Sequence, residues 1–97
     1  MITPDMRPRL AAKARLRFDA RTNRHLLLYP EKGMQLNGTA ADIVRLCTGE
    51  HTVAAIVSEL AAKYDSQPRA SIEREVNSFL SALAERQLIE DDAGKSP

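Results

Sequence analysis

The sequence predicts an α+β domain of winged-helix-like architecture, in which a three-stranded antiparallel meander is followed by three helices. Three observations lead to this fold class. The 97 residues suffice for one modest hydrophobic core and not for two. Apolar side chains alternate with period 2 up to residue 36 and recur with period 3.6 beyond residue 39. Turn and capping residues separate these periodic segments from one another.

Composition marks the two ends of the domain. Residues 1–13 contain Pro4, Pro8 and few apolar side chains, which is typical of an extended N-terminal arm. A single domain is expected over residues 14–90, because neither a linker composition nor an internal repeat interrupts this part of the chain. Residues 91–97 are rich in acidic residues and contain Gly and Pro, which predicts a disordered tail.

Three strands are expected in order along the chain. Residues 14–19 alternate apolar and charged side chains, which is the pattern of a half-buried strand. Residues 25–29 are almost continuously apolar and predict a strand that is buried more deeply. A turn is expected between them at residues 21–23, and a second turn at residues 30–33 combines Pro with Gly. A short third strand at residues 34–36 completes the meander.

Three helices are expected to follow the strands. Thr39 and Asp42 have the spacing of a capping box at the start of the first helix, and Gly49 suits the backbone geometry at its end. Thr52 predicts the cap of a second helix, whose apolar positions repeat every three to four residues up to Tyr64. The third helix is expected to begin near Ser71, after a polar break that contains proline.

The sequence lacks the groups of residues that enzymes and metal sites need. Cys47 is the one cysteine, so neither an intrachain disulfide nor a cysteine cluster can form, and a packed core thiol is expected. His25 and His51 have no carboxylate or thiol at a fixed spacing, and no glycine-rich phosphate loop is present. We therefore expect a binding module that has no catalytic activity, cofactor or metal. The absence of a signal-peptide pattern and of a long apolar run predicts a cytoplasmic chain without membrane contact.

Charge is distributed unevenly along the chain. Residues 1–36 carry eight Lys/Arg and three Asp/Glu, whereas residues 37–97 carry six Lys/Arg and ten Asp/Glu. Two interpretations of this distribution stay open. The first part of the chain either presents a basic face to an anionic partner, or simply differs in composition because strands and helices differ.

A winged-helix-like fold raises DNA binding as an alternative function, with the third helix as the recognition helix. The exposed positions of that helix include three carboxylates and two cations, namely Glu73, Arg74, Glu75, Glu85 and Arg86. Because DNA affinity comes largely from Lys and Arg that neutralise phosphates, no nucleic-acid partner is expected.

The two outer strands of the meander differ in charge. Arg15, Arg17 and Asp19 lie on the first strand, where charged side chains protect an edge against unwanted pairing. Residues 34–37 at the other edge contain neither a charge nor a proline. Such an edge is either covered by the protein's own chain or open to an incoming strand, and the residues alone leave both possibilities open.

A set of segments in fixed order carries a resemblance to a known family. The segment Leu36-Asn37-Gly38-Thr39-Ala40 is followed by Ile43, by Leu46-Cys47-Thr48-Gly49 and by Thr52, and is preceded by Arg7-Pro8-Arg9-Leu10 and residues 26–31. This set resembles the PqqD family, whose members are accessory proteins of pyrroloquinoline quinone biosynthesis. The resemblance covers roughly residues 7–90 and departs at Thr48 and Ala55, where acidic residues are common in the family.

The resemblance implies a peptide chaperone, which binds the precursor peptide PqqA and presents it to the radical S-adenosylmethionine enzyme PqqE. In related domains the leader peptide adds a strand beside the third strand and lies in a groove against the third helix. The peptide-binding residues implied here are Met34, Gln35, Leu36, Asn37, Glu75, Val76, Ser78, Phe79 and Leu83. The periodicity does not decide whether the peptide faces the flank of the helix with Glu75 and Ser78 or the flank with Glu73 and Asn77.

Further expectations concern the partners. The basic residues of the arm, Arg7, Arg9 and Lys13, are candidates for docking the enzyme. A domain that merely scaffolds an enzyme complex stays open as a third function beside peptide binding and DNA binding. A monomer is the default expectation, and a dimer through strand pairing or arm exchange stays open.

Overall fold

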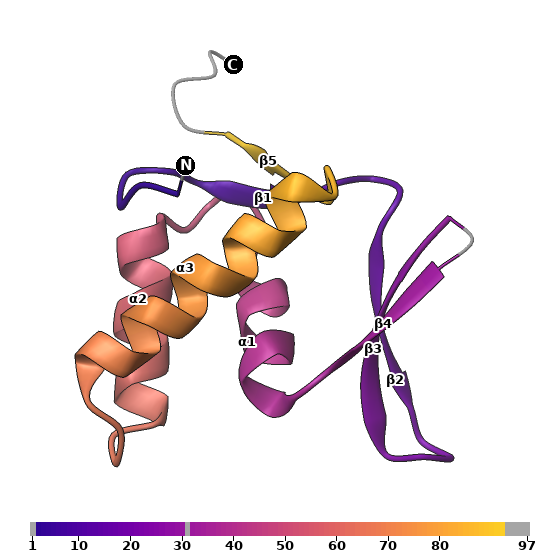
Figure 1. Cartoon of the computed structure of the whole chain (residues 1–97), viewed down its shortest axis with the longest axis horizontal. Helices are drawn as coiled ribbons and strands as arrows, with labels where there is room; N and C mark the ends of the chain where they lie inside the picture. Colours follow the sequence, from indigo (N-terminus) through magenta and orange to yellow (C-terminus); the bar gives the residue numbers. More distant parts are fainter. Residues whose placement is uncertain (1, 31, 93–97) are drawn as a thin grey trace.

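The computed structural model describes residues 2–30 and 32–92, in which a three-stranded sheet lies to one side of three helices (Figure 1). Their order confirms the predicted α+β class, with three antiparallel strands ahead of three helices. The elements are β1 (Pro8–Leu10), β2 (Arg15–Asp19), β3 (Arg24–Tyr29), β4 (Lys32–Leu36), α1 (Gly38–Leu46), α2 (Val53–Lys63), α3 (Arg69–Glu85) and β5 (Ile89–Asp91).

The predicted meander is present as a three-stranded antiparallel sheet in the order β2-β3-β4. Leu16, Leu27 and Met34 stand opposite one another across the three strands, so their side chains share the face that packs toward the helices. The strand β4 begins two residues earlier than expected, because Tyr29 already pairs with Lys32. The expected turn at residues 30–33 is therefore too long, and the edge strand carries the charge of Lys32.

A second, two-stranded sheet was not predicted. The strands β1 and β5 pair antiparallel, with Leu10 opposite Ile89, and they join the two ends of the described chain above the helices (Figure 1). Of the arm expected at residues 1–13, the structure describes residues 2–13, which turn at residues 4–5 and 12–13 and form β1 of the folded domain at residues 8–10. The disordered tail expected from residue 91 is wrong for its first two residues, because Asp91 belongs to β5 and the Asp92 N–H donates to the Arg7 carbonyl. Residues 93–97 of the predicted tail lie outside the described residues.

The N-terminal segment also completes the start of α2. The backbone N–H groups of Val53 and Ala54 donate to the carbonyls of Met6 and Pro4, at 2.8 and 3.1 Å. The predicted cap Thr52 is confirmed, because its Oγ1 accepts from a further N–H in the first turn. These bonds satisfy donors that have no partner within a helix, so the N-terminal segment stabilises α2.

The start of α1 differs from the predicted capping box. Asn37 is the N-cap, and its Oδ1 accepts from the Ala40 N–H at 2.8 Å. Thr39 therefore lies inside the helix, and Asp42 is not in the first turn but among the buried residues of α1. Asn is a stronger cap than Thr, which agrees with the shift of the cap by two residues from Thr39 to Asn37.

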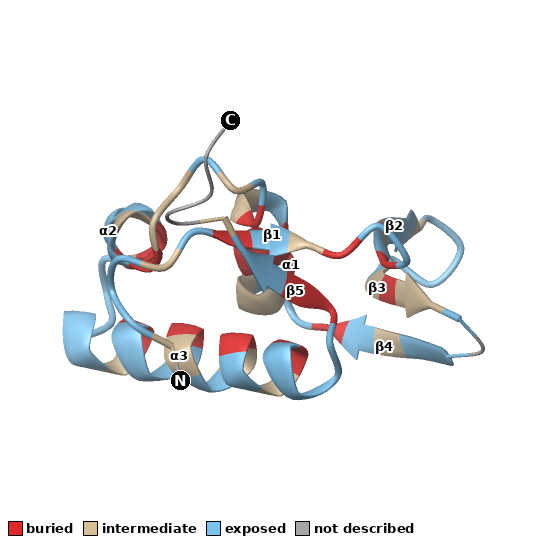
Figure 2. Ribbon diagram, turned by 90° about the horizontal axis from the view of Figure 1, so that it is seen from above, coloured by how far each residue is buried: buried red, intermediate tan, exposed pale blue. Residues whose placement is uncertain are grey.

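The hydrophobic core lies between the three helices and the inner face of the larger sheet. Figure 2 shows the buried parts of α1, α2 and α3 turned toward one another. The fully buried side chains of the core include Leu27 from the sheet and Ile56, Ile72, Leu80 and Leu83 from the helices. None of the helices in the described part of the chain is long and apolar enough to cross a membrane.

Candidate functional site

The strand β4 is an edge of the larger sheet, since within the described residues it pairs only with β3. Figure 2 shows β4 on the side of the sheet where α3 lies. The side chain of Met34 is half-buried and that of Leu36 is buried, whereas Gln35 is exposed and accepts a hydrogen bond from Arg24 at 2.7 Å. The outer backbone groups of β4 therefore remain available for pairing with a further strand.

A groove opens where β4 ends and α1 begins. It has a volume of about 240 Å³ and lies between the first turns of α1 and the middle of α3. The residues that line it are Asn37, Thr39, Ala40 and Ile43 on one side and Glu75, Ser78 and Phe79 on the other. Its apolar lining residues are buried or half-buried, while the polar ones carry hydroxyl, amide and carboxylate groups. This combination suits an apolar side chain that is attached to a polar backbone.

The position of the groove decides which flank of α3 faces it. Glu75 and Ser78 line the groove, on the flank beside α1. Glu73 and Asn77 instead border a separate cavity of about 110 Å³ beneath the N-terminal segment and α2. The sequence could not distinguish these flanks, because helical periodicity places residues on a helix without fixing how the helix is rotated against its neighbours.

The structure divides the remaining predicted site residues into two groups. Phe79 is half-buried and reaches the groove, and Asn37 lines it while capping α1. Val76 and Leu83 are fully buried, and Leu36 is 5% exposed, so their side chains belong to the core. The groove beside the end of β4 is therefore lined by residues of α1 and α3 and not by Leu36.

Three lining residues were missed by the sequence analysis. Thr39 was assigned to a capping box, and Ala40 and Ile43 were named only within the segments that resemble the PqqD family. Ile43 is 1% exposed, so it is a core residue that also borders the groove. Ala40 and Ile43 are three residues apart and so lie on one face of α1, directly after the open strand. That spacing directly after the uncharged residues 34–37 was the signal that could have identified them.

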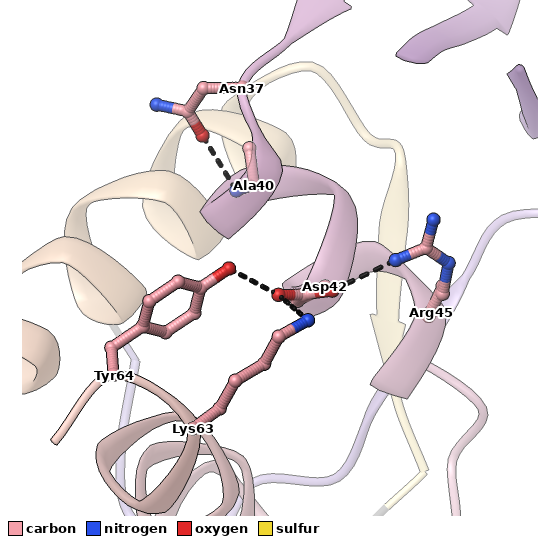
Figure 3. Close-up of polar contacts among 6 residues, drawn as sticks. All are labelled: Asn37, Ala40, Asp42, Arg45, Lys63 and Tyr64. Atoms are coloured by element: carbon pink, nitrogen blue, oxygen red, sulfur yellow. Dashed lines mark hydrogen bonds and ion pairs between the residues drawn. The ribbon is translucent and has the colours of Figure 1, made fainter.

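A buried carboxylate fixes the wall of the groove that α1 provides. Figure 3 shows Asp42 between three donors: Tyr64 Oη at 2.6 Å, Lys63 Nζ at 2.8 Å and Arg45 Nη1 at 2.8 Å. Burial by itself would raise the pKa of Asp42, but the hydrogen bonds from Lys63 and Tyr64 outweigh it and hold the pKa below its usual value. Since Lys63 ends α2 and Tyr64 follows it, the carboxylate joins α1 to the end of α2.

Replacing Asp42 with Asn is expected to lower the free energy of unfolding at pH 7 by about 1–3 kcal/mol, because charge-assisted hydrogen bonds are lost. The folded-state pKa of Asp42 is depressed, so its contribution is complete above the unfolded-state pKa of about 3.9 and disappears as pH falls through the folded-state value. Urea unfolding at pH 7 and at pH 2 should show a difference between wild type and variant that shrinks in acid. Asp65→Asn, at an exposed position, is the control, and an equal loss in both variants would contradict the role of Asp42.

Cys47 has the environment of a core residue. Its side chain is 4% exposed, and burial raises the pKa of its thiol to about 12. A protonated, buried thiol is a poor nucleophile, which agrees with its expected place in the core. Within residues 2–30 and 32–92, no three His, Cys, Asp or Glu side chains gather in a geometry that could hold a metal ion.

The cations of the predicted docking arm differ in their surroundings. Arg9 forms an ion pair with Asp92 at 3.4 Å, and the Arg7 guanidinium donates to the Glu50 carbonyl at 3.4 Å. Lys13 is exposed and lies with the basic residues of β2 rather than with Arg7 and Arg9. The three residues therefore do not form one basic surface, and their role in docking an enzyme stays a prediction.

Comparison with known proteins shows likeness over nearly the whole chain. The model of the family described as coenzyme PQQ synthesis protein D (PqqD) matches residues 24–89. A "PqqA binding protein" of Rhodopseudomonas palustris (strain HaA2) is 35% identical over 96 residues, which cover 99% of this chain and 93% of the relative. A "bifunctional coenzyme PQQ synthesis protein C/D" of Methylorubrum extorquens is 39% identical over 83 residues, or 86% of this chain. That match spans only 22% of the length of the bifunctional relative.

One solved structure is also similar in its fold. It is the solution structure of the PqqD part of Methylobacterium extorquens PqqCD, described as a functional, stand-alone recognition element for a ribosomally synthesised and post-translationally modified peptide. The superposition has a TM-score of 0.78 with 34% sequence identity, and it covers 93% of this chain and 95% of the other. The sequence and the fold therefore point to the same group of proteins.

Proposed function

The chain belongs to the PqqD family, and from this premise we propose that it binds the precursor peptide PqqA in pyrroloquinoline quinone biosynthesis. Two kinds of relative support the proposal. Proteins that are 35% and 36% identical over 96 residues are named for binding PqqA. The structurally similar PqqD domain is described as a peptide-recognition element that functions on its own.

The observation that carries the proposal is the open edge of β4, which leads directly into the groove between α1 and α3. An incoming peptide strand would bind the outer main-chain groups of β4, which gives affinity with little dependence on sequence. Selectivity would come from an apolar side chain placed against the half-buried Ala40 and Phe79. The volume of about 240 Å³ lies below the ~300–1,000 Å³ of small-molecule pockets, which favours one peptide side chain over a whole cofactor.

We further propose that the chain presents its bound peptide to PqqE and performs no chemistry itself. The buried Cys47 supports this division of labour, since its thiol is protonated and inaccessible. DNA binding has less support, because the exposed residues Glu73, Glu75 and Glu85 would repel a duplex. The cytoplasm, where ribosomal peptides are made, is the proposed location.

A nuclear magnetic resonance titration with PqqA tests the proposed binding mode. We expect chemical-shift changes and slowed amide exchange at residues 32–37, in the first turns of α1 and at Glu75, Ser78 and Phe79, because these groups would become covered. Glu73 and Asn77, on the other flank of α3, serve as internal controls and should change little. A response confined to residues 2–13 would contradict strand addition at β4.

A further inference from the structure

The outward face and free edge of β2 form a second surface, which the proposed peptide site does not use. Arg15 and Arg17 project from β2 on the face of the sheet that points away from the helices. With Lys13, Leu28 and Tyr29 they border an open depression of about 600 Å³. Leu28 and Tyr29 are half-buried, so the floor of this depression is apolar while its rim is cationic. We refer to these five residues as the basic face.

The cations of the basic face differ from Arg7, Arg9 and Arg24, whose side chains have partners. Within residues 2–30 and 32–92, Lys13, Arg15 and Arg17 have neither an ion pair nor a side-chain hydrogen bond, although all three are exposed. Arg9, by contrast, is held by Asp92, and Arg24 by Gln35. Unpaired cations in a shallow depression attract an anionic surface.

Charge is also separated between the two parts of the molecule. Residues 13–36, which include the larger sheet, carry six Lys/Arg and two Asp/Glu, for a net charge of +4. Residues 37–92, which include the three helices, carry five Lys/Arg and ten Asp/Glu, for a net charge of −5. The chain as a whole carries +1, because the opposite charges of these two parts nearly cancel. An acidic partner would be attracted to the sheet and repelled by the helices.

We propose that the basic face docks the enzyme that modifies the bound peptide, through a patch of Asp and Glu side chains on that enzyme. The proposal rests on the proposed function, because a peptide bound for modification must be reached by a second protein. An apolar floor within a cationic rim, rich in Arg and containing Tyr, is the composition of a protein–protein interface. A nucleic acid would bind a uniformly basic groove and would gain little from Leu28.

The arrangement of the sheet allows both partners to bind at once. The strands β2 and β4 are opposite edges of the three-stranded sheet, about 10 Å apart at the usual strand spacing. An enzyme on the β2 edge would leave the β4 edge and the groove uncovered. It would nevertheless lie close to the segment of peptide that continues beyond the groove. The proposed docking surface therefore lies on β2 and not at Arg7 and Arg9, the arm cations that were predicted to dock the enzyme.

Charge reversal in β2 tests the proposal with the purified full-length chain, PqqA and PqqE. We expect Arg17→Glu to weaken enzyme binding about tenfold, and Arg15→Glu with Arg17→Glu about a hundredfold, because like charges would then face each other across the interface. Arg74→Glu, an equal change at an exposed position on α3, is the matched control and should alter the affinity less than twofold. Affinity for PqqA is measured on every variant, and its retention shows that the fold is intact.

The outcomes separate this proposal from the proposed function. Loss of enzyme binding with unchanged PqqA binding supports the basic face, and the wild-type affinity should then fall as salt is raised. The proposal is overturned if the variant with both reversals binds the enzyme as tightly as the wild-type chain does. It is also overturned if the wild-type chain does not bind the enzyme even at low salt. A third contradicting result would be that the chain binds a short DNA duplex through the same arginines more tightly than it binds the enzyme. A chain that binds the enzyme through β2 but fails to bind PqqA would refute the proposed function and leave the docking surface standing.

Discussion

Replacing Ser78 with Trp is expected to weaken binding of PqqA by about a hundredfold, or ~2.7 kcal/mol, while the fold remains intact. Ser78 is exposed and stands at the rim of the groove, across from Thr39 and Ala40. An indole at this position would fill the part of the groove in which the apolar side chain of the peptide is proposed to bind. Because the serine side chain contributes nothing to the core, the free energy of unfolding should change by less than about 0.5 kcal/mol.

Ser81→Trp provides the matched control for this prediction. Ser81 is an exposed serine on the same helix, three residues further along, and it does not line the groove. Isothermal titration with PqqA should therefore give an affinity within about twofold of wild type for Ser81→Trp. Equal losses in both variants would mean that the peptide lies along the outward face of α3, and no loss in Ser78→Trp would remove the groove from the binding site.

The elements that periodicity encodes locally were predicted, whereas those that depend on distant pairing were not. The strands of the meander and the three helices each contain enough residues for their period to appear in the sequence. The strands β1 and β5 have three residues each and come from opposite ends of the chain. No alternation can be recognised in so few residues, and Pro4 and Pro8 favoured an extended arm without indicating a partner for it.

Asp42 illustrates a second limit of sequence reasoning. A carboxylate three residues after Thr39 has the spacing of a capping box, which is a local interaction. The structure instead buries Asp42 and supplies Lys63 and Tyr64 from the end of another helix. Asp42 is therefore held by contacts with another helix and not by a local cap. The residue that does cap α1, Asn37, was assigned to the peptide site and not to the helix.

The sequence analysis named the α3 wall of the groove but not the α1 wall. The resemblance implied that α3 lines the site, and helical spacing placed Ser78 on one flank of the apolar stripe that contains Phe79. Helical spacing could not identify the opposing wall, because Ala40 and Ile43 have the apolar character of ordinary core residues. A groove is a property of two surfaces and of the distance between them, and only the packing of α1 against α3 defines that distance. The same packing separates α3 side chains that support the fold from those that meet a ligand.

That separation predicts opposite behaviour for two residues that the sequence placed in one site. Leu83 is fully buried, so Leu83→Ala should lower the free energy of unfolding by about 3 kcal/mol through lost burial and a new cavity. This is a large fraction of the ~5–15 kcal/mol that stabilises a typical domain. The fraction of the variant that remains folded should bind PqqA with an affinity within about twofold of wild type, because Leu83 does not line the groove.

Phe79→Ala should show the reverse pattern. Phe79 is half-buried and forms part of the groove floor, so its loss should lower the free energy of unfolding by only about 1–2 kcal/mol. Binding of PqqA should weaken at least about tenfold, since the apolar side chain of the peptide loses its main contact. Urea unfolding and peptide titration on both variants, at a temperature where both are folded, measure the two effects independently. If Leu83→Ala weakened peptide binding as much as Phe79→Ala, the groove would not be a separate surface, and peptide affinity would simply follow the stability of α3.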